Sequence, residues 1–508
     1  MSIETTDDAA AHREAGPRPG QLQRGLGLLD ATMIVVGSMI GSGIFITSAE
    51  STRLVGAPGW LLAAWALAGL LTITGALCCA ELAAMMPRAG GQYVFLREAY
   101  GPALGFLFGW SLFLVIQTGT IAAVAVAFAR FTGVLWPWVA ADNYLVAPVR
   151  LSADYAVSLS TEQLTAVSLI LLLTYTNTRG LRLGRLIQNA FTFTKTAALA
   201  GLILVGLLVG WNAGSAAYTS AWWDSWANGW NPQAAQPGLA ATGGLALAML
   251  LGRAMTGPLF AQSAWNNVTF TGSEIRDPGR NLPRSLLVGC AVVVGLYLLA
   301  NLAYVVTLPL EVMQQPGKSI ATATMQAALG PAGTVLMAAF IMVSTFGCNN
   351  GLILAGARVN YAMACDRLFF GRVARLNSRH VPAVALAVQG VWASLLTLPR
   401  TVTTDAAGRA TYGNVYNQLL EYIIPADLVF YVLMVGAVVV LRRKRPGAPR
   451  PYRTPGYPLV PAVYVLLATL LTLDLVYLAR LTSGLGFLLV LTGLPVYYLW
   501  RRGAGKRI

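Results

Sequence analysis

Near the middle of its first long apolar segment, residues 28–54, the chain reads VGSMIGSGIF from Val36 to Phe45. Two glycines in this stretch, Gly41 and Gly43, flank a serine. Glycine adopts non-helical backbone angles without the steric cost that a Cβ imposes, but small residues also let membrane helices pack closely. The stretch therefore favours either a tight helix contact or a turn at which the helix unwinds.

A second interruption lies in the sixth apolar segment, residues 240–275, where the chain reads GPLFAQSAW from Gly257 to Trp265. Proline removes a helical hydrogen bond, and small residues follow it. Two interrupted helices at corresponding places in the halves of a chain are typical of inverted-repeat transporters with a site at mid-membrane depth. We therefore expect a site between these two segments, although only the spacing of the segments indicates the symmetry.

An unwound turn in lipid frees backbone groups that a continuous helix would satisfy. The N-terminal end of a half-helix attracts an anion, and the C-terminal end of the opposing half attracts an ammonium group. An α-amino acid carries both charges on neighbouring atoms, so the break favours an amino acid as substrate. A substrate without a carboxylate would leave the N–H groups of the break unused.

The composition indicates that lipid is the solvent for much of the chain. Of its 508 residues, 56% are hydrophobic and 11% are charged, whereas soluble domains carry about 25% charged residues. A spanning helix needs roughly 20 apolar residues, and the chain offers about twelve such segments. We predict an all-α membrane protein whose transmembrane helices lie at 28–54, 59–86, 103–135, 161–178, 187–210, 240–275, 284–308, 332–357, 381–398, 415–441, 458–480 and 484–500.

Lysine and arginine concentrate in alternate connectors and in both tails, as in the cytoplasmic loops of membrane proteins. This pattern accounts for the net charge of +15 without nucleic acid as a partner, and it predicts that both termini are cytoplasmic. The predicted parts are an N-terminal tail, a five-helix repeat, an extracytoplasmic loop, a second repeat, two further helices and a C-terminal tail, at 1–26, 27–210, 211–239, 240–445, 446–500 and 501–508. The loop is rich in tryptophan, which favours a lid, a partner surface or an aromatic belt at the interface.

The chain has five cysteines and two histidines, with no metal-ligand spacing among them. We therefore expect no metal and no cofactor. A membrane-embedded enzyme would need a paired base and nucleophile at membrane depth, and a channel would need symmetric polar rings. The sequence favours neither, so a secondary transporter is the better hypothesis.

Motifs spread over most of the chain resemble those of the amino acid–polyamine–organocation superfamily, and most closely those of its L-type amino acid transporters. They are VGSMIGSGIF at Val36, GALCCAEL at Gly75, GGQY at Gly90, WN at Trp265, RNLP at Arg280, NLAY at Asn301, FG at Phe346, NG at Asn350 and GLPVY at Gly493. The resemblance implies a sodium-transporter-like fold of 5+5 inverted repeats plus two extra helices. It also implies transport of amino acids, neutral L-amino acids first, across the plasma (inner) membrane by alternating access.

The resemblance further implies that both breaks contact the substrate. Its carboxylate would meet N–H groups around Ser42, its ammonium would meet carbonyls near Ile40 and in the sixth segment, and Phe260 would close over it. The implied contact residues are Ile40, Gly41, Ser42, Gly43, Ile44, Phe260, Ala261, Gln262 and Ser263. Relatives often have two glycines where this chain has Ser263 and Ala264, so the size of the accepted substrate is open.

Lys195 is an ionisable residue within the apolar segment 187–210, and such residues are costly in membranes unless they serve a function. The resemblance implies that its ammonium replaces the sodium ion of sodium-coupled relatives, near the first break and Ser344 or Thr345. A side chain that extends to the cytoplasmic interface is the alternative. The hypothesis is sodium-independent transport, with exchange and proton symport both open.

Polar residues in other segments suggest a pocket for the substrate side chain, lined by Gln117, Thr120, Asn350 and Asp427. An acidic group there would favour polar or cationic substrates, so cationic amino acids, polyamines or other organic amines are the alternative substrates. Arg253 and Glu421 suggest an outer gate, against the alternative that Arg253 extends to the outer surface.

In the family that this chain resembles, animal members form a disulfide with a partner glycoprotein through a cysteine between helices three and four. The corresponding loop, residues 136–160, contains no cysteine. We therefore expect no disulfide-linked heavy chain, and the resemblance implies a monomer.

Overall fold

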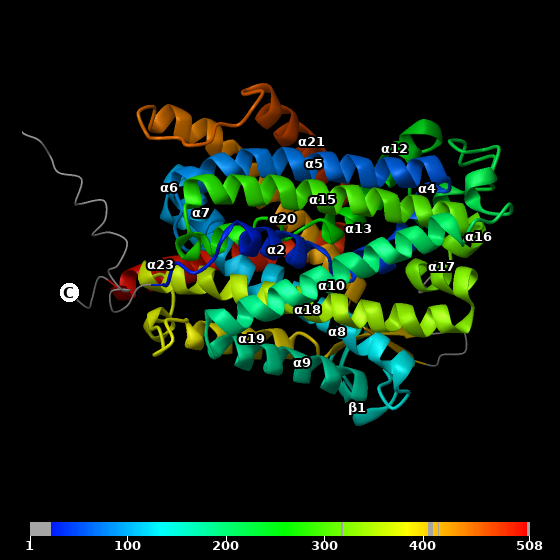
Figure 1. Cartoon of the computed structure of the whole chain (residues 1–508), viewed down its shortest axis with the longest axis horizontal. Helices are drawn as coiled ribbons and strands as arrows, with labels where there is room; N and C mark the ends of the chain where they lie inside the picture. The colour runs from blue at the N-terminus through cyan, green and yellow to red at the C-terminus, as the bar shows by residue number, and fades with distance from the viewer. Residues whose placement is uncertain (1–21, 316–318, 405–409, 415, 505–508) are drawn as a thin grey trace, which may run out of the picture.

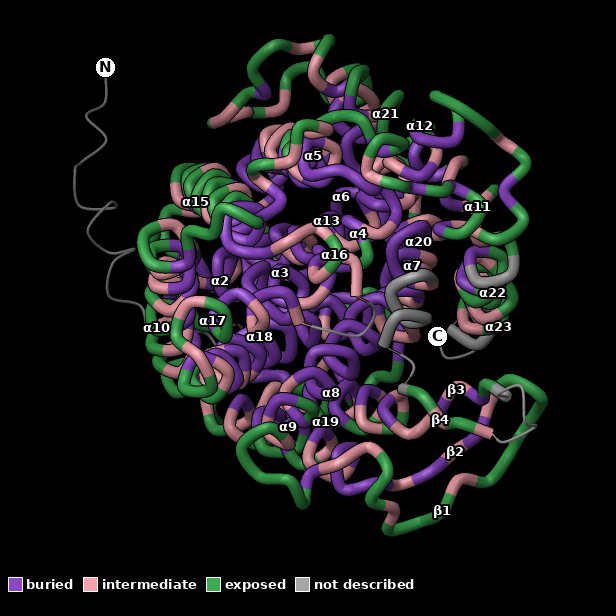
Figure 2. Tube along the Cα trace, turned by 90° about the vertical axis from the view of Figure 1, so that its right-hand side faces the viewer, coloured by how far each residue is buried: buried purple, intermediate pink, exposed green. Residues whose placement is uncertain are grey.

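The computed structural model describes residues 22–315, 319–404, 410–414 and 416–504. Long helices lie side by side along the longest axis of the molecule (Figure 1). Seen down that axis, the buried positions gather in the middle of the bundle and the exposed ones lie around its edge (Figure 2).

The first half of the chain forms one interrupted helix, four long ones and shorter pieces. These are α2 (Leu28–Met39), α3 (Gly43–Ile46), α4 (Ser48–Val55), α5 (Pro58–Met85), α6 (Gln92–Tyr100), α7 (Pro102–Ser111), the π-helical turn Leu112–Ile116, α8 (Gln117–Leu135), α9 (Thr161–Thr178) and α10 (Leu181–Leu208). The tryptophan-rich connector adds the 3₁₀ turn Ala216–Tyr218 and α11 (Pro232–Ala235).

The second half begins with another interrupted helix. Its elements are α12 (Gly243–Ala254), α13 (Thr256–Ala261), α14 (Asn267–Phe270), the 3₁₀ turn Gly272–Glu274, α15 (Pro278–Thr307), α16 (Leu310–Met313), α17 (Ile320–Leu329), α18 (Pro331–Cys365), the 3₁₀ turn Gly371–Ala374, α19 (Ala383–Leu395), α20 (Tyr416–Lys444), α21 (Leu459–Leu478), α22 (Arg480–Leu491) and α23 (Gly493–Ala504).

Within the described residues, 10 helical segments are long and apolar enough to cross a membrane. The chain is therefore a multi-pass membrane protein. Two of the twelve predicted spans, 161–178 and 381–398, are not among the 10. At 1.5 Å per residue, the 13 residues of α19 cover about 20 Å, less than the roughly 30 Å of a bilayer core.

A four-stranded sheet corrects the prediction of an all-α fold. Its strands are β1 (Tyr144–Arg150), β2 (Tyr155–Ser160), β3 (Pro399–Thr404) and β4 (Ala410–Asn414), all antiparallel and in the order β1-β2-β3-β4. The first hairpin leads into α9 and the second follows α19, so the sheet joins the ends of these two shorter helices. All four strands lie in the predicted connectors 136–160 and 399–414, and each strand is too short to stand out in the sequence.

Buried Arg400 fixes the sheet to the start of α9. Its guanidinium donates to the hydroxyl oxygens of Ser158 at 3.1 Å and Ser160 at 2.7 Å. Ser160 is also the N-cap of α9, where it accepts from the backbone N–H of Gln163. One buried cation thus holds both hairpins against the helix that follows them.

The tryptophan-rich connector packs on the end of α4 and the start of α5. The Ser225 hydroxyl donates to the carbonyl of Val55 at 2.5 Å, and the N–H of Gly59 donates to the carbonyl of Trp222 at 2.9 Å. Trp223 meets Trp60 edge to face with ring centroids 5.2 Å apart. The connector therefore covers these helix ends, while its role as a lid, a partner surface or a belt stays a prediction.

Candidate substrate site between two broken helices

The first helix unwinds where its glycines predict. α2 ends at Met39, and Ile40 leaves the helix with an extended ψ of 92°. The chain resumes helical geometry in α3 at Gly43. Three residues, Ile40 to Ser42, therefore form an unwound turn that is buried inside the bundle.

Side chains from three other helices donate hydrogen bonds to the carbonyls that this turn leaves without helical partners. The Cys348 thiol lies 3.2 Å from the carbonyl of Ser38, and the Tyr297 hydroxyl lies 2.9 Å from that of Met39. The Ser344 hydroxyl lies 3.3 Å from the carbonyl of Ile40 and 3.2 Å from that of Gly41. The break is thus stabilised by α15 and α18, and by Lys195 of α10.

Lys195 is 1% exposed and donates to the carbonyls of Gly37 at 2.5 Å and Ile40 at 2.7 Å. The carbonyl oxygen of Ser344 lies 3.4 Å from the same nitrogen. An ammonium has three protons and no acceptor, so these three carbonyls can satisfy it. The side chain points into the bundle, which rules out the alternative that it extends to the interface.

The other predicted neighbour of Lys195 does not contact it. The Thr345 hydroxyl donates to the carbonyl of Ile341 on its own helix at 2.7 Å. Ser344 contributes both its hydroxyl to the unwound turn and its carbonyl to Lys195. Of the two predicted neighbours, Ser344 therefore contacts Lys195.

The sixth segment breaks later than the proline suggests. Pro258 lies within α13, and the chain unwinds after Ala261, over residues 262–266. Ala264 adopts a positive φ of 64°, a conformation that costs energy for a residue with a Cβ. Proline cannot donate to the carbonyl four residues earlier, and the Ser51 hydroxyl donates to that carbonyl, of Ala254, at 2.7 Å.

The two breaks touch each other. A Cβ on Gly43 would lie 2.6 Å from the Cβ of Ala261, so only glycine permits this approach. The Tyr297 hydroxyl lies 3.2 Å from the carbonyl of Ala261 as well as 2.9 Å from that of Met39. One phenol on α15 thus contacts the end of each half-helix.

Sequence reasoning missed the polar face of α15. Tyr297, Asn301 and Tyr304 follow one another at helical spacing on one face. Asn301 accepts from the Ser48 hydroxyl at 2.8 Å, and the Tyr304 hydroxyl donates to the carbonyl of Ile44 at 3.2 Å. The i, i+4, i+7 spacing of these polar groups within an apolar segment is the signal that could have identified them.

A small cavity lies beside the second break, with about 20 Å³ of space, which is room for about one water molecule. Its walls come from α5, α13, the unwound stretch, α20 and α21, and are Leu71, Thr72, Leu259, Gln262, Ser263, Trp265, Ile424, Asp427, Leu428, Tyr431 and Tyr464. Two predicted contact residues, Gln262 and Ser263, therefore share this cavity with the acidic Asp427. Phe260 is buried close by in α13.

The other predicted pocket residues do not line this cavity. The Gln117 amide donates to the carbonyl of Leu352 at 2.8 Å, and the Thr120 hydroxyl donates to that of Ile116 at 2.6 Å. Asn350 accepts from Asn177 at 2.9 Å and donates to Gln188 at 3.0 Å. Its amide therefore joins α9 and α10 to α18.

The predicted outer gate cannot be placed as a pair. Arg253 lies in the last turn of α12, and Glu421 is in α20. The side chain of Glu421 lies outside the described residues. The Arg253–Glu421 gate stays a prediction.

Known proteins resemble this chain over nearly its whole length. The sequence model of the amino acid permease family matches residues 26–494. The large neutral amino acids transporter small subunit 2 of Mus musculus and that of Homo sapiens are each 30% identical over 97% of this chain, and the match covers 84% and 83% of those proteins. The b(0,+)-type amino acid transporter 1 of Homo sapiens is 28% identical over 97% of this chain and 91% of that protein.

A match from residue 26 to residue 494 includes both broken helices and Lys195. The buried breaks offer paired backbone groups, which fits carriage of a substrate. The chain therefore belongs to the amino acid permease family, within the amino acid–polyamine–organocation superfamily, and is a membrane transporter of amino acids rather than an enzyme.

Proposed function

We propose that this protein is a sodium-independent secondary transporter of amino acids, with neutral L-amino acids as its main substrates. The observation that carries the proposal is the ammonium of Lys195, which donates to the carbonyls of Gly37 and Ile40 in the first broken helix. Alternating access between the two sides of the membrane is the mechanism that paired broken helices support.

The charge at Lys195 explains why sodium is not needed. Carbonyl oxygens are the ligands that a hard cation such as Na⁺ prefers. Lys195 already engages three of them, and its positive charge would repel a sodium ion at the same place. An ammonium group on the chain can therefore stabilise the unwound turn without a sodium ion.

The substrate would lie between the breaks. The first N–H groups of α3, at Gly43 and Ile44, lack partners within their own helix and suit the carboxylate, together with Ser42. Carbonyls at Ile40, Gly41 and Ala261 suit the ammonium. Phe260, Gln262 and Ser263 would then surround the substrate and close it off from one side.

Asp427 supports a second candidate, a substrate with a polar or cationic side chain. Its carboxylate shares a small cavity with Gln262 and Ser263, where it could accept hydrogen bonds from a donor. A buried carboxylate favours a cationic partner. The small-subunit relatives are named for large neutral amino acids, whereas the name of the b(0,+)-type relative says only amino acid, and this favours the first candidate.

The finer architecture belongs to the same proposal. We infer twelve spans in two inverted five-helix repeats plus two further helices, with α9 and α19 as the short fourth and ninth spans. The distribution of basic residues supports cytoplasmic termini in the plasma membrane. The curated relatives are named small subunits, but the cysteine-free loop 136–160 supports a chain that works without a disulfide-linked partner.

Uptake into proteoliposomes tests the proposal. We expect labelled leucine to accumulate equally in sodium and choline buffers, whereas a collapse in choline would contradict sodium independence. Preloading with unlabelled leucine, or imposing a pH gradient, distinguishes exchange from proton symport. Competition by leucine, lysine and putrescine distinguishes neutral amino acid, cationic amino acid and polyamine substrates.

A further inference from the structure

An open groove lies where α15 begins, at the end of the bundle that the basic residues predict to be cytoplasmic. It has a volume of about 510 Å³, within the range of small-molecule sites. The first turns of α15 and the connector between α20 and α21 line it, through Asp277, Pro278, Gly279, Arg280, Pro283, Arg284, Pro451 and Tyr452.

The groove continues an exposed apolar face of α15. Arg280, Arg284, Val288 and Val292 are spaced four residues apart and therefore share one face of α15. Val288 is 53% exposed and Val292 is 42% exposed, as expected for side chains that face lipid. The two arginines continue this face toward the helix start and are also exposed, at the depth where headgroups lie.

The polar groups of the groove are available to a ligand. Among the described residues, neither Arg280 nor Arg284 has an ion-pair or hydrogen-bond partner for its side chain. Both guanidinium groups belong to exposed residues, so a ligand in the groove can reach them.

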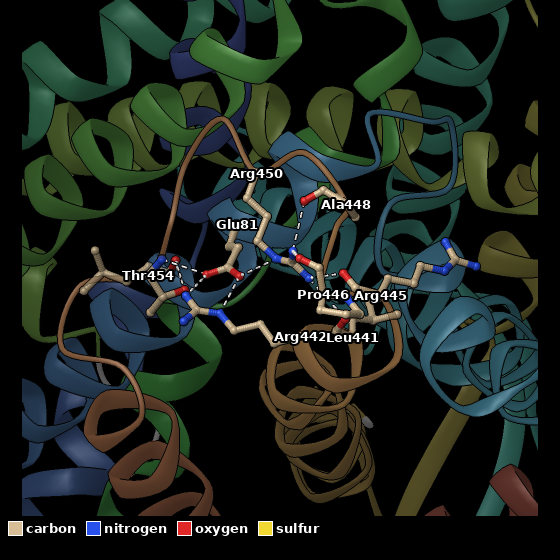
Figure 3. Close-up of polar contacts among 9 residues, drawn as sticks. Glu81, Leu441, Arg442, Arg445, Pro446, Ala448, Arg450 and Thr454 are labelled. Atoms are coloured by element: carbon tan, nitrogen blue, oxygen red, sulfur yellow. Dashed lines mark hydrogen bonds and ion pairs between the residues drawn. The ribbon is translucent and has the colours of Figure 1, made fainter.

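An ionic cluster fixes the wall that carries Tyr452 (Figure 3). Glu81 of α5 pairs with Arg450 at 3.4 Å and accepts from the N–H of Thr454 at 2.8 Å. Arg442 adds two hydrogen bonds to the same carboxylate, at 2.8 and 2.6 Å. Pro451 and Tyr452 lie between the two anchored residues, so the groove is held open rather than formed by a loose loop.

We propose that this groove binds the phosphate of an anionic phospholipid headgroup. Two guanidinium groups supply donors for phosphate oxygens, and the apolar face of α15 continues from them toward the acyl chains. Basic pockets beside membrane helices on the cytoplasmic side are suited to such lipids. A free phosphate ion would share the headgroup contacts but would gain nothing from the apolar face.

A substitution at Asp277 should strengthen lipid binding, whereas substitutions at the arginines should weaken it. Its carboxylate lines the groove and repels an anion there. Asp277 has a positive φ of 44°, which asparagine also tolerates. Asp277→Asn should therefore preserve the backbone and tighten lipid binding, by about threefold to fivefold.

Native mass spectrometry of the purified full-length chain measures binding of short-chain phosphatidylglycerol, with phosphatidylcholine as the zwitterionic comparison. We expect one preferred phosphatidylglycerol site. In the double variant Arg280→Gln/Arg284→Gln its affinity should fall about tenfold to thirtyfold, since each surface charge contributes about 1 kcal/mol. The matched control Arg372→Gln/Arg375→Gln removes two other exposed arginines and should leave the affinity within about twofold.

Three outcomes would overturn the proposal. Equal losses in both double variants would indicate a general attraction to basic protein. Retained affinity in the groove variant would place the lipid elsewhere. Displacement of phosphatidylglycerol by an equal concentration of inorganic phosphate would indicate a soluble-anion site. As a control, melting temperatures equal to that of the native chain would show that each variant is folded when its affinity is measured.

Discussion

The two broken helices differ in where they are held. At the first break, Lys195 and Ser344 bond to the carbonyls of the unwound turn. At the second, bonds from other helices reach the two ends: the Gln262 amide donates to the carbonyl of Trp65 at 3.4 Å, and the Asn266 amide donates to Gln92 at 2.5 Å. Between them, Ser263 bonds back to Phe260 within the same stretch, at 2.8 Å. The first break is therefore fixed at its centre by neighbouring helices, whereas the second is fixed at its ends.

This difference suggests a division of labour. Segments with few stabilising contacts open at lower free-energy cost than well-bonded ones. The centre of the second break, with the small cavity and the strained Ala264, is therefore the part that we expect to adapt as a substrate enters. The first break would present the same backbone groups throughout the cycle.

Removal of the ammonium at the first break should have the largest effect. Lys195→Met keeps the length of the side chain but removes its charge and its hydrogen bonds. Each charge-assisted bond contributes about 1.5–3 kcal/mol, so loss of two should lower leucine uptake at least about a hundredfold. Proteoliposome uptake, normalised to the amount of folded transporter, measures this.

The neighbouring Thr194 provides the control, because it is exposed and its hydroxyl bonds to Ala190 of its own helix. Thr194→Ala should transport within about twofold of the native chain, as surface substitutions usually change stability by less than 0.5 kcal/mol. If Lys195→Met transports as well as Thr194→Ala, the fixed first break has no role in function.

A smaller loss should follow from forcing the two breaks apart. Gly43→Ala places a Cβ 2.6 Å from that of Ala261, and overpacking of this kind costs about 1–3 kcal/mol. We expect uptake to fall about tenfold to a hundredfold, with partial recovery in Gly43→Ala/Ala261→Gly. Gly295→Ala is the matched control, because a Cβ there meets nothing within 4 Å.

The fold was predictable where one local signal decides the structure. The flanking glycines Gly41 and Gly43 located the first break, because unwinding there depends on the residues of the turn itself. The contact of Lys195 with that turn followed from the family resemblance. The bridging hydroxyl of Tyr297 was missed, because an aromatic residue in an apolar segment looks like ordinary packing.

The unwound residues 262–266 fall at the end of the predicted stretch Gly257–Trp265, not at its proline, for a tertiary reason. Pro258 predicts the loss of a hydrogen bond, but Ser51 supplies the missing donor from another helix, so the helix continues to Ala261. The sheet was missed because its two hairpins, 144–160 and 399–414, form one structure only after α9 and α19 meet. Each hairpin alone is too short for its sequence to indicate β-structure.

We expect the smallest effect from removing the Ser51 hydroxyl, which donates to the carbonyl that Pro258 cannot reach. Ser51→Ala leaves the buried carbonyl of Ala254 without this hydroxyl, and such a loss costs about 1–3 kcal/mol. Much of that cost should fall on stability, so we expect a lower melting temperature and uptake reduced about fivefold. In the Pro258→Ala background, residue 258 regains an N–H that can donate to the same carbonyl. Ser51→Ala should then have almost no effect, whereas an equal effect in both backgrounds would show that Ser51 acts through another contact.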